Sequence, residues 1–289
     1  MRINWFPGHM NKARRLIGET MSNVSLVIEV LDARLPYSSE NPLVPELRGE
    51  TPCSKVLNMS DLADPAVTKQ WVTWLERERG VRALPLSLGE TGRARSILNI
   101  GRDLLGAKRW VRTGGVHAMI LGIPNVGKST LINTLAGRKV AKTANKPAVT
   151  QHQQRVRIDQ YLSLLDTPGF LWPRLHPAER GYRLAASGAI KDAVIDLEDV
   201  AYWLLDPLRT RYPEAVQERY GMPSLPAQRE ALFEAIAHKR GAQGRGGHID
   251  RHRVSEIILR DFRSGTLGRI SLETPADCEP PETSEPSTD

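Results

Sequence analysis

The chain has 289 residues, of which 40% are hydrophobic and 25% charged, a globular composition with room for two domains. No apolar run reaches the roughly 18 residues that a membrane span requires, and the N-terminus lacks the apolar stretch of a secretory signal. Two cysteines far apart in sequence, Cys53 and Cys278, argue against a disulfide framework or a cysteine-based metal site. We therefore expect a cytoplasmic protein without a membrane partner.

The net charge is +7 and is unevenly distributed along the chain. Residues 273–289 hold six acids and no Lys or Arg, so the rest of the chain is more basic than the total indicates. A basic body favours a polyanionic partner, with nucleic acid first. A charged surface that serves only solubility would look the same.

Apolar runs alternate with helical patterns as far as Phe170. After a leading helix over Asn11–Met21, the apolar runs predict five strands, over Val24–Leu31, Ser54–Asn58, Val81–Ser87, Val116–Gly122 and Tyr161–Leu165. The helical patterns between them cover Pro65–Arg79, Gly92–Lys108 and Lys128–Ala136. This alternation is typical of an α/β fold, with a mostly parallel sheet flanked by helices.

The strand pattern stops after Phe170. Four further helices are predicted, over Ala178–Lys191, Asp196–Leu205, Pro226–Arg240 and Arg251–Arg263. We therefore divide the chain into an α/β domain at 1–175, a small all-helical domain at 176–272 and an acidic tail at 273–289. The tail is rich in Pro, Glu, Ser and Thr, a composition typical of disorder.

The most specific motif is GIPNVGKST, which begins at Gly122 and matches the P-loop pattern G-x-x-x-x-G-K-[ST] between a predicted strand and a predicted helix. Such a loop points backbone N–H groups at the phosphates of a nucleotide. The residues expected to bind the nucleotide in this way are Asn125, Val126, Gly127, Lys128, Ser129 and Thr130. The side chain of Lys128 is also expected to reach the terminal phosphates, and that of Ser129 to bind Mg²⁺.

A second motif, DTPG, runs from Asp166 to Gly169 after the last predicted strand. An Asp at a strand end can hold Mg²⁺, and the Gly169 N–H is placed to face the γ-phosphate. Thr150, in the loop between the motifs, is expected to complete the Mg²⁺ shell and to act as a switch, unless it is an ordinary surface residue. Lys128, Thr150 and Gly169 are therefore catalytic candidates.

The base-reading motif lies early in the chain. GTPases usually read guanine with N-K-x-D downstream of the P-loop, where nothing fits here, but Asn58 and Asp61 follow an upstream strand with that spacing. The Asp61 carboxylate would accept hydrogen bonds from guanine N1–H and N2–H₂, which adenine does not offer. Ser87 and Leu88, after the next strand, stand where backbone groups would contact the guanine oxygen. Alternatively, Asn58 and Asp61 form a turn that caps the following helix.

The motif order is thus a circular permutation of the usual GTPase order, and here the chain resembles the ribosome biogenesis GTPase A group, the YlqF-type permuted GTPases. The matching segments are WFPGHMNKA, VLDARLP, LNMSDLAD, GIPNVGKSTLIN, PAVTQ, LLDTPGFLWP and LRDFRSGTLGRISLE. The resemblance implies GTP and GDP as ligands, and GTP hydrolysis coupled to late assembly of the large ribosomal subunit. It also implies contact with rRNA. Met59 departs from the usual Lys and Ala148 from the usual Gly, which bears on nucleotide affinity and switch geometry.

Two further roles come from the resemblance. Phe170 stands where many GTPases carry a Gln that orients water, and the resemblance implies that His9 supplies this function if the N-terminal arm folds over the γ-phosphate. Otherwise His9 only caps or packs a helix start. Asn125 is similar to an Asn that holds K⁺ beside the phosphates in related GTPases, although a loop-turn role would suit it equally.

Basic residues also gather near the C-terminus, around the Gly-rich segment RGAQGRGGH, which is typical of arms that order on RNA. The RNA-binding candidates are Arg245, Arg251, Arg253, Arg260 and Arg263. A solvated basic surface is the alternative. We expect a monomeric factor that binds the precursor of the large ribosomal subunit. It should hydrolyse GTP slowly on its own and faster when the ribosomal particle stimulates it. A non-catalytic GTP-dependent RNA-binding scaffold and a tRNA-acting or membrane-linked GTPase are the competing hypotheses.

Overall fold

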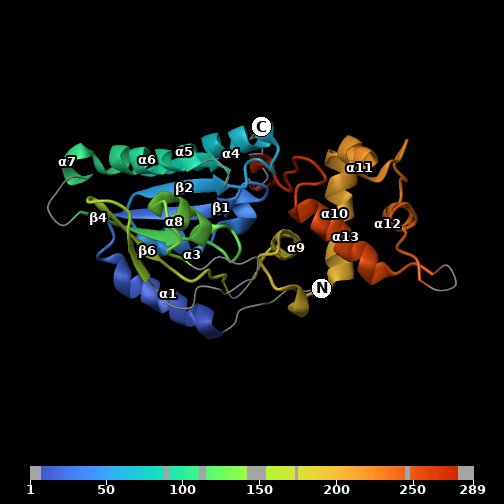
Figure 1. Ribbon diagram of the computed structural model, residues 1–289, viewed down its shortest axis with the longest axis horizontal. Helices are drawn as coiled ribbons and strands as arrows, with labels where there is room; N and C mark the ends of the chain where they lie inside the picture. Colours follow the sequence, from blue (N-terminus) through green and yellow to red (C-terminus); the bar gives the residue numbers. More distant parts are fainter. Residues whose placement is uncertain are drawn as a thin grey trace, which may run out of the picture.

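The computed structural model describes residues 8–87, 91–110, 115–141, 154–172, 175–244 and 248–278, with the backbone alone for 8–13, 91, 108 and 109. Within these ranges the chain forms an α/β domain followed by a helical domain (Figure 1). Among the helices so described, none is both long enough and apolar enough to cross a bilayer.

The centre of the first domain is a six-stranded sheet with the order β3-β2-β1-β4-β6-β5. Its strands are β1 (Leu26–Asp32), β2 (Cys53–Asn58), β3 (Val81–Leu86), β4 (Val116–Leu121), β5 (Gln154–Arg157) and β6 (Leu162–Asp166). All neighbours pair in parallel except β5 with β6. Every residue of β1 is buried, as expected of a central parallel strand with helices on both faces. The mostly parallel α/β fold is therefore confirmed.

The edge strand β5 is missing from the sequence-based prediction. It has one buried residue, Val156, between exposed Arg155 and Arg157. A short antiparallel edge strand buries one face, so it lacks the continuous apolar run by which the other strands were found.

Helices cover both faces of the sheet, with α4 to α7 above it and α1 below it in Figure 1. They are α1 (Gly8–Met21), α2 (Pro36–Ser39), α3 (Leu43–Arg48), α4 (Pro65–Leu75), α5 (Thr91–Ala94), α6 (Ser96–Leu105), α7 (Ala107–Trp110) and α8 (Lys128–Ala136). The single helix predicted over Gly92–Lys108 is therefore wrong in detail. Gly106, at φ +76°, ends α6 because this left-handed conformation suits glycine.

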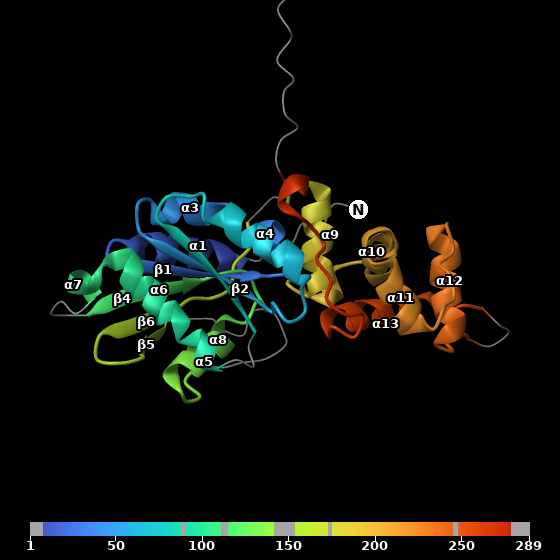
Figure 2. The same cartoon turned by 90° about the horizontal axis from the view of Figure 1, so that it is seen from above.

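The second domain begins with α9 (Ala178–Ser187), which stands between the sheet and the remaining helices (Figure 2). The other elements are the 3₁₀ turn η1 (Asp192–Val194), α10 (Leu197–Arg211), α11 (Pro213–Tyr220), α12 (Arg229–Lys239), α13 (Arg251–Arg263) and the 3₁₀ turn η3 (Pro275–Asp277). The helix predicted over Asp196–Leu205 ends earlier than α10, and α11, which starts at Pro213, was not predicted. Buried side chains of both domains, such as Phe170 and Leu184, belong to one continuous apolar core.

The expected disorder from Glu273 onward is wrong for the first six residues of the tail. Glu273 is fully buried, and its carboxylate accepts hydrogen bonds from the Ser38 backbone N–H (2.8 Å) and hydroxyl (2.5 Å). Trp71 Nε1 donates to its backbone oxygen at 3.2 Å, and Arg183 pairs with its carboxylate at 3.3 Å. Composition could not reveal this, because the partners come from three distant segments of the chain.

Candidate nucleotide-binding site

The predicted motifs converge at one edge of the sheet. Asn58 ends β2, the P-loop follows β4, and Asp166 ends β6. These strands run parallel within one sheet, so their carboxyl ends share an edge, which is where open α/β sheets bind ligands.

The P-loop backbone requires glycine at two positions. A Cβ on Gly122 would collide with the Val30 carbonyl oxygen of the neighbouring β1. Gly127 has φ +98° and directly precedes α8, so the loop turns sharply into the helix start. The Lys128 ammonium folds back over the loop and donates to the carbonyl oxygens of Gly122 (2.9 Å) and Ile123 (2.7 Å). Lys128 is therefore held against the backbone of the P-loop by two hydrogen bonds.

The electrostatics of this loop suit a phosphate and a cation. Burial lowers the pKa of Lys128 to about 8 and raises the pKa of Asp166 to about 6, while the opposite charge of each partner counteracts the shift. Asp166 Oδ1 is buried and has no hydrogen-bond partner among the described residues. A bound phosphate would favour charged Lys128, and a metal ion would favour charged Asp166. The orphaned oxygen therefore fits an Mg²⁺ ligand, with Ser129 at the start of α8 as the second candidate.

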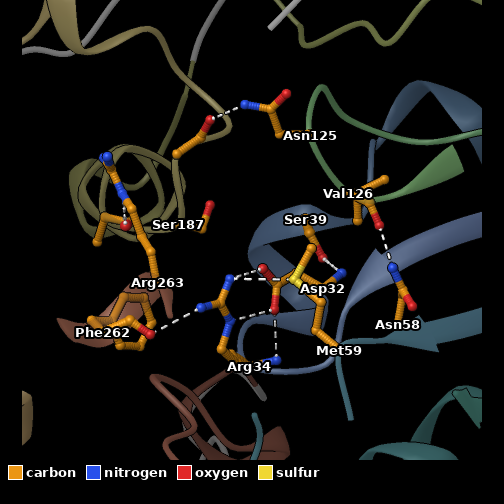
Figure 3. Close-up of polar contacts among 12 residues, drawn as sticks. Asp32, Arg34, Ser39, Asn58, Met59, Asn125, Val126, Ser187, Phe262 and Arg263 are labelled. Atoms are coloured by element: carbon orange, nitrogen blue, oxygen red, sulfur yellow. Dashed lines mark hydrogen bonds and ion pairs between the residues drawn. The ribbon is translucent and has the colours of Figure 1, made fainter. Parts of the chain in front are cut away.

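Asn58 connects the early motif to the P-loop. Its Nδ2 donates to the Val126 carbonyl oxygen at 2.7 Å, and its Oδ1 is buried with no partner in the part of the chain that is described (Figure 3). Asp61 is exposed, and Ser87 is half-buried after β3. The cap of α4 is Asp64, whose carboxylate accepts from Ala66 and Val67. The alternative that Asn58 or Asp61 caps this helix is therefore wrong.

Met59 lies against a buried ion pair, between Arg34 and Asp32, that was not predicted from the sequence. Arg34 binds Asp32 through Nε (2.9 Å) and Nη2 (2.7 Å), and both side chains are almost fully buried. Arg34 Nη2 also donates to Met59 Sδ at 3.5 Å, and its Nη1 donates to the Phe262 carbonyl oxygen at 3.3 Å (Figure 3). This guanidinium therefore links the end of β1, the loop after β2 that carries Met59 and Asp61, and the end of α13. Asp32 and Arg34 both lie in the VLDARLP segment, which was noted in the sequence for its resemblance to the family.

Asn125 joins the P-loop to the second domain. It has φ +61°, and its Nδ2 donates to the Gly188 carbonyl oxygen at 2.8 Å, just beyond α9 (Figure 3). A cavity of about 740 Å³ lies beside this contact, and its lining includes Met59, Lys191 and Arg263. The second domain thus forms one wall of the space next to the P-loop.

The DTPG segment packs closely on the P-loop. A Cβ on Gly169 would lie 2.8 Å from Lys128 Nζ and 2.9 Å from the backbone of Pro124. Thr167 Oγ1 donates to the Ile120 carbonyl oxygen at 2.6 Å and fixes the turn. The Phe170 side chain is fully buried in the core and therefore does not face the space above the loop.

Several candidates lie outside the described residues or are differently placed. Leu88, Thr150 and Arg245 fall outside the described ranges, as does the side chain of His9. Arg251 pairs with Glu230 and Glu198, and Arg263 pairs with Asp192 and binds the carbonyl oxygens of Ala185 and Ala186. Arg253 and Arg260 are exposed. Arg251 and Arg263 therefore stabilise the helical domain, which was not expected of RNA-binding residues.

Known proteins resemble the chain over nearly its full length. The family described as "50S ribosome-binding GTPase" matches residues 117–228. Ribosome biogenesis GTPase A of Priestia megaterium is 41% identical, over 97% of this chain and 100% of the relative. Mitochondrial ribosome-associated GTPase 1 of Mus musculus is 33% identical, over 93% of this chain and 89% of the relative.

Solved structures agree with this. GNP-bound YlqF from T. maritima has a TM-score of 0.64 at 27% identity and covers 91% of this chain and 98% of its own. A GDP-bound YlqF structure gives the same TM-score at 28% identity, over 91% of this chain and 100% of that one. The convergence of a P-loop and an upstream base motif on one sheet edge, together with full-length identity above 40%, leads to one conclusion: the chain belongs to the ribosome biogenesis GTPase A family and is a guanine-nucleotide-binding GTPase.

Proposed function

We propose that this GTPase binds rRNA and acts in late maturation of the large ribosomal subunit. The observation that carries the proposal is the direct contact of the P-loop with the second domain, through Asn125 and Gly188. A nucleotide at the P-loop would compete with the Gly188 carbonyl oxygen for the Asn125 side chain. Nucleotide binding would therefore change a contact at the start of the helical domain. The names of the relatives, which refer to ribosome biogenesis and to the mitochondrial ribosome, indicate the ribosomal particle as the partner.

In this proposal each motif has a separate task. Asn58 braces the P-loop from the base side, Asp61 reads guanine, and Ser87 with Leu88 contacts the guanine oxygen. Lys128 stabilises charge on the terminal phosphates. The nucleotide-binding backbone is contributed by Asn125, Val126, Gly127, Lys128, Ser129, Thr130 and Gly169.

Mg²⁺ would be held by Ser129, Thr150 and Asp166, and when bound it neutralises charge that develops on the phosphates. Asp166 Oδ1, buried without a hydrogen-bond partner in the described ranges, supports this assignment. Asn125 would hold K⁺ after releasing the Gly188 carbonyl oxygen. His9 would orient the attacking water, a role that the buried Phe170 side chain does not fill.

The residues proposed to bind RNA are Arg253 and Arg260, which are exposed, and Arg245, which lies outside the described residues. Arg253 and Arg260 lie on α13, whose C-terminal end contacts Arg34 next to the loop that carries Met59 and Asp61. RNA bound along α13 would therefore act close to the nucleotide site. Contact of these side chains with phosphates would make the affinity fall as salt rises. The factor is proposed to act as a monomer.

The test is GTP turnover by the full chain with and without large-subunit particles. Particles are expected to stimulate wild type, Lys128→Ala is expected to abolish turnover in both conditions, and His9→Ala to remove most of the stimulated rate. The double variant Arg253→Ala/Arg260→Ala should lose stimulation at physiological salt but keep the basal rate. Arg82→Ala, which removes an exposed arginine on β3, is the matched control.

Particles that leave the wild-type rate unchanged would contradict the proposal. Equal stimulated rates for His9→Ala and wild type would remove His9 from the mechanism and leave the rest standing.

A further inference from the structure

The loop that carries Asp61 is held by the far end of the chain. Residues 265–273, here called the C-terminal strap, leave α13 and run back along the first domain (Figure 2). The Ile270 N–H donates to the Leu62 carbonyl oxygen at 2.9 Å, and Ser271 Oγ accepts from the Asp64 N–H at 3.1 Å. The loop is therefore fixed on the C-terminal side of Asp61.

The N-terminal side of the loop is fixed through Arg34. Met59 is held in a left-handed conformation, at φ +60°, with its sulfur on the Arg34 guanidinium. The strap also holds Arg34, because the Leu272 N–H donates to the Arg34 carbonyl oxygen at 2.7 Å. The strap thus contacts the loop directly after the exposed Asp61, at Leu62 and Asp64, and indirectly before it, through Arg34 and Met59.

The strap itself is firmly placed. Ile270, Ser271 and Leu272 are each at most 2% exposed. The hydroxyl of Tyr212, which lies between α10 and α11, accepts a hydrogen bond from the Ser271 N–H at 3.1 Å and donates one to the Ser271 carbonyl oxygen at 3.2 Å. Because the strap is bonded to both domains, it gives the loop a rigid support.

We propose that the C-terminal strap positions Asp61 for guanine, with Ser271 and Gly265 as positioning residues that set the selectivity for the base. The inference rests on the proposed role of Asp61. Gly265 faces the loop from the start of the strap, where an added Cβ would lie 2.5 Å from Leu62 Cδ2. An exposed carboxylate can form two hydrogen bonds to a base only while its backbone is held in place.

A comparison of GDP with inosine diphosphate isolates this role. Inosine lacks the 2-amino group that Asp61 is proposed to bind, but its phosphates and ribose are the same. A defect in the Asp61 position lowers the ratio of the two affinities. A merely destabilised protein loses active fraction for both nucleotides equally, and the ratio does not change.

The experiment measures both affinities by competition against a fluorescent GDP analogue, using the full chain. Wild type is expected to prefer GDP by about tenfold or more, as charge-assisted hydrogen bonds allow, and Asp61→Ala to lose this preference. Ser271→Ala, which leaves the Asp64 N–H without its acceptor, is expected to lower the ratio about threefold to tenfold. Ser264→Ala is its control, because the Ser264 hydroxyl bonds only to Asp261 and Thr266 among the described residues.

A glycine pair provides an independent test. Gly265→Ala and Gly268→Ala both place a methyl group at positive φ, +74° and +91°. Only the first methyl group meets Leu62, because no atom of the described residues lies within 4 Å of the second. The ratio should fall for Gly265→Ala alone. Wild-type ratios in both Ser271→Ala and Gly265→Ala would overturn the inference. A preference for GDP that survives in Asp61→Ala would instead overturn the proposed base site.

Discussion

Replacing Arg34 with Met tests how much the buried ion pair with Asp32 stabilises the folded chain. The side chains of Arg34 and Asp32 are only 2% and 4% exposed, and the substitution leaves the carboxylate with the Arg34 backbone N–H (3.0 Å) as its remaining described hydrogen bond. Removing one partner of a buried pair costs about 3–5 kcal/mol, because the other charge stays buried without compensation. The contacts of Arg34 with the carbonyl oxygen and ring of Phe262 are lost as well.

Urea denaturation followed by circular dichroism measures this cost. Adding Asp32→Asn to Arg34→Met should recover about 2 kcal/mol, because no buried charge then remains. Arg15→Met is the matched control, since Arg15 pairs with Glu19 at 2.7 Å but its side chain is 83% exposed, and its unfolding midpoint should equal that of wild type. The reasoning is refuted if Arg34→Met unfolds at the same urea concentration as Arg15→Met.

Two further predictions concern the first domain. Burial raises the pKa of Glu29 to about 8 from an ordinary 4.5, so between these values the folded state keeps a proton that the unfolded state has released, and stability falls as pH rises, by at most about 1.4 kcal/mol per pH unit. In urea titrations at about pH 5.5, 6.5 and 7.5, the unfolding free energy of Glu29→Gln should depend less steeply on pH than that of wild type. An unchanged slope would contradict the raised pKa of Glu29. Gly169→Ala should reduce GTP turnover by about tenfold or more, because its Cβ would meet the backbone of Pro124 at 2.9 Å and displace the DTPG segment from the P-loop. Turnover at the wild-type rate in a folded Gly169→Ala protein would show that this close approach is dispensable.

The sequence by itself determined the fold class and the phosphate loop. Short continuous apolar runs between turn residues are typical of central parallel strands buried on both faces, so β1 and β4 were placed correctly from local pattern. The P-loop could be found because its glycines answer a local backbone requirement, visible at Gly122 and Gly127. The spacing of Asn58 from Asp61 could likewise be found in the sequence, because Asn58 ends a strand and Asp61 follows it closely.

Only the tertiary structure decided which side chains meet across the two domains. Acidic composition predicted disorder from Glu273, but the energy of a buried carboxylate depends on partners such as Ser38 and Arg183, far away in sequence. Arg263 was an RNA-binding candidate in the sequence, and in the fold it pairs with Asp192. Local periodicity reports burial, whereas a buried polar contact is set by which distant segments the packing brings together, and no local pattern encodes that.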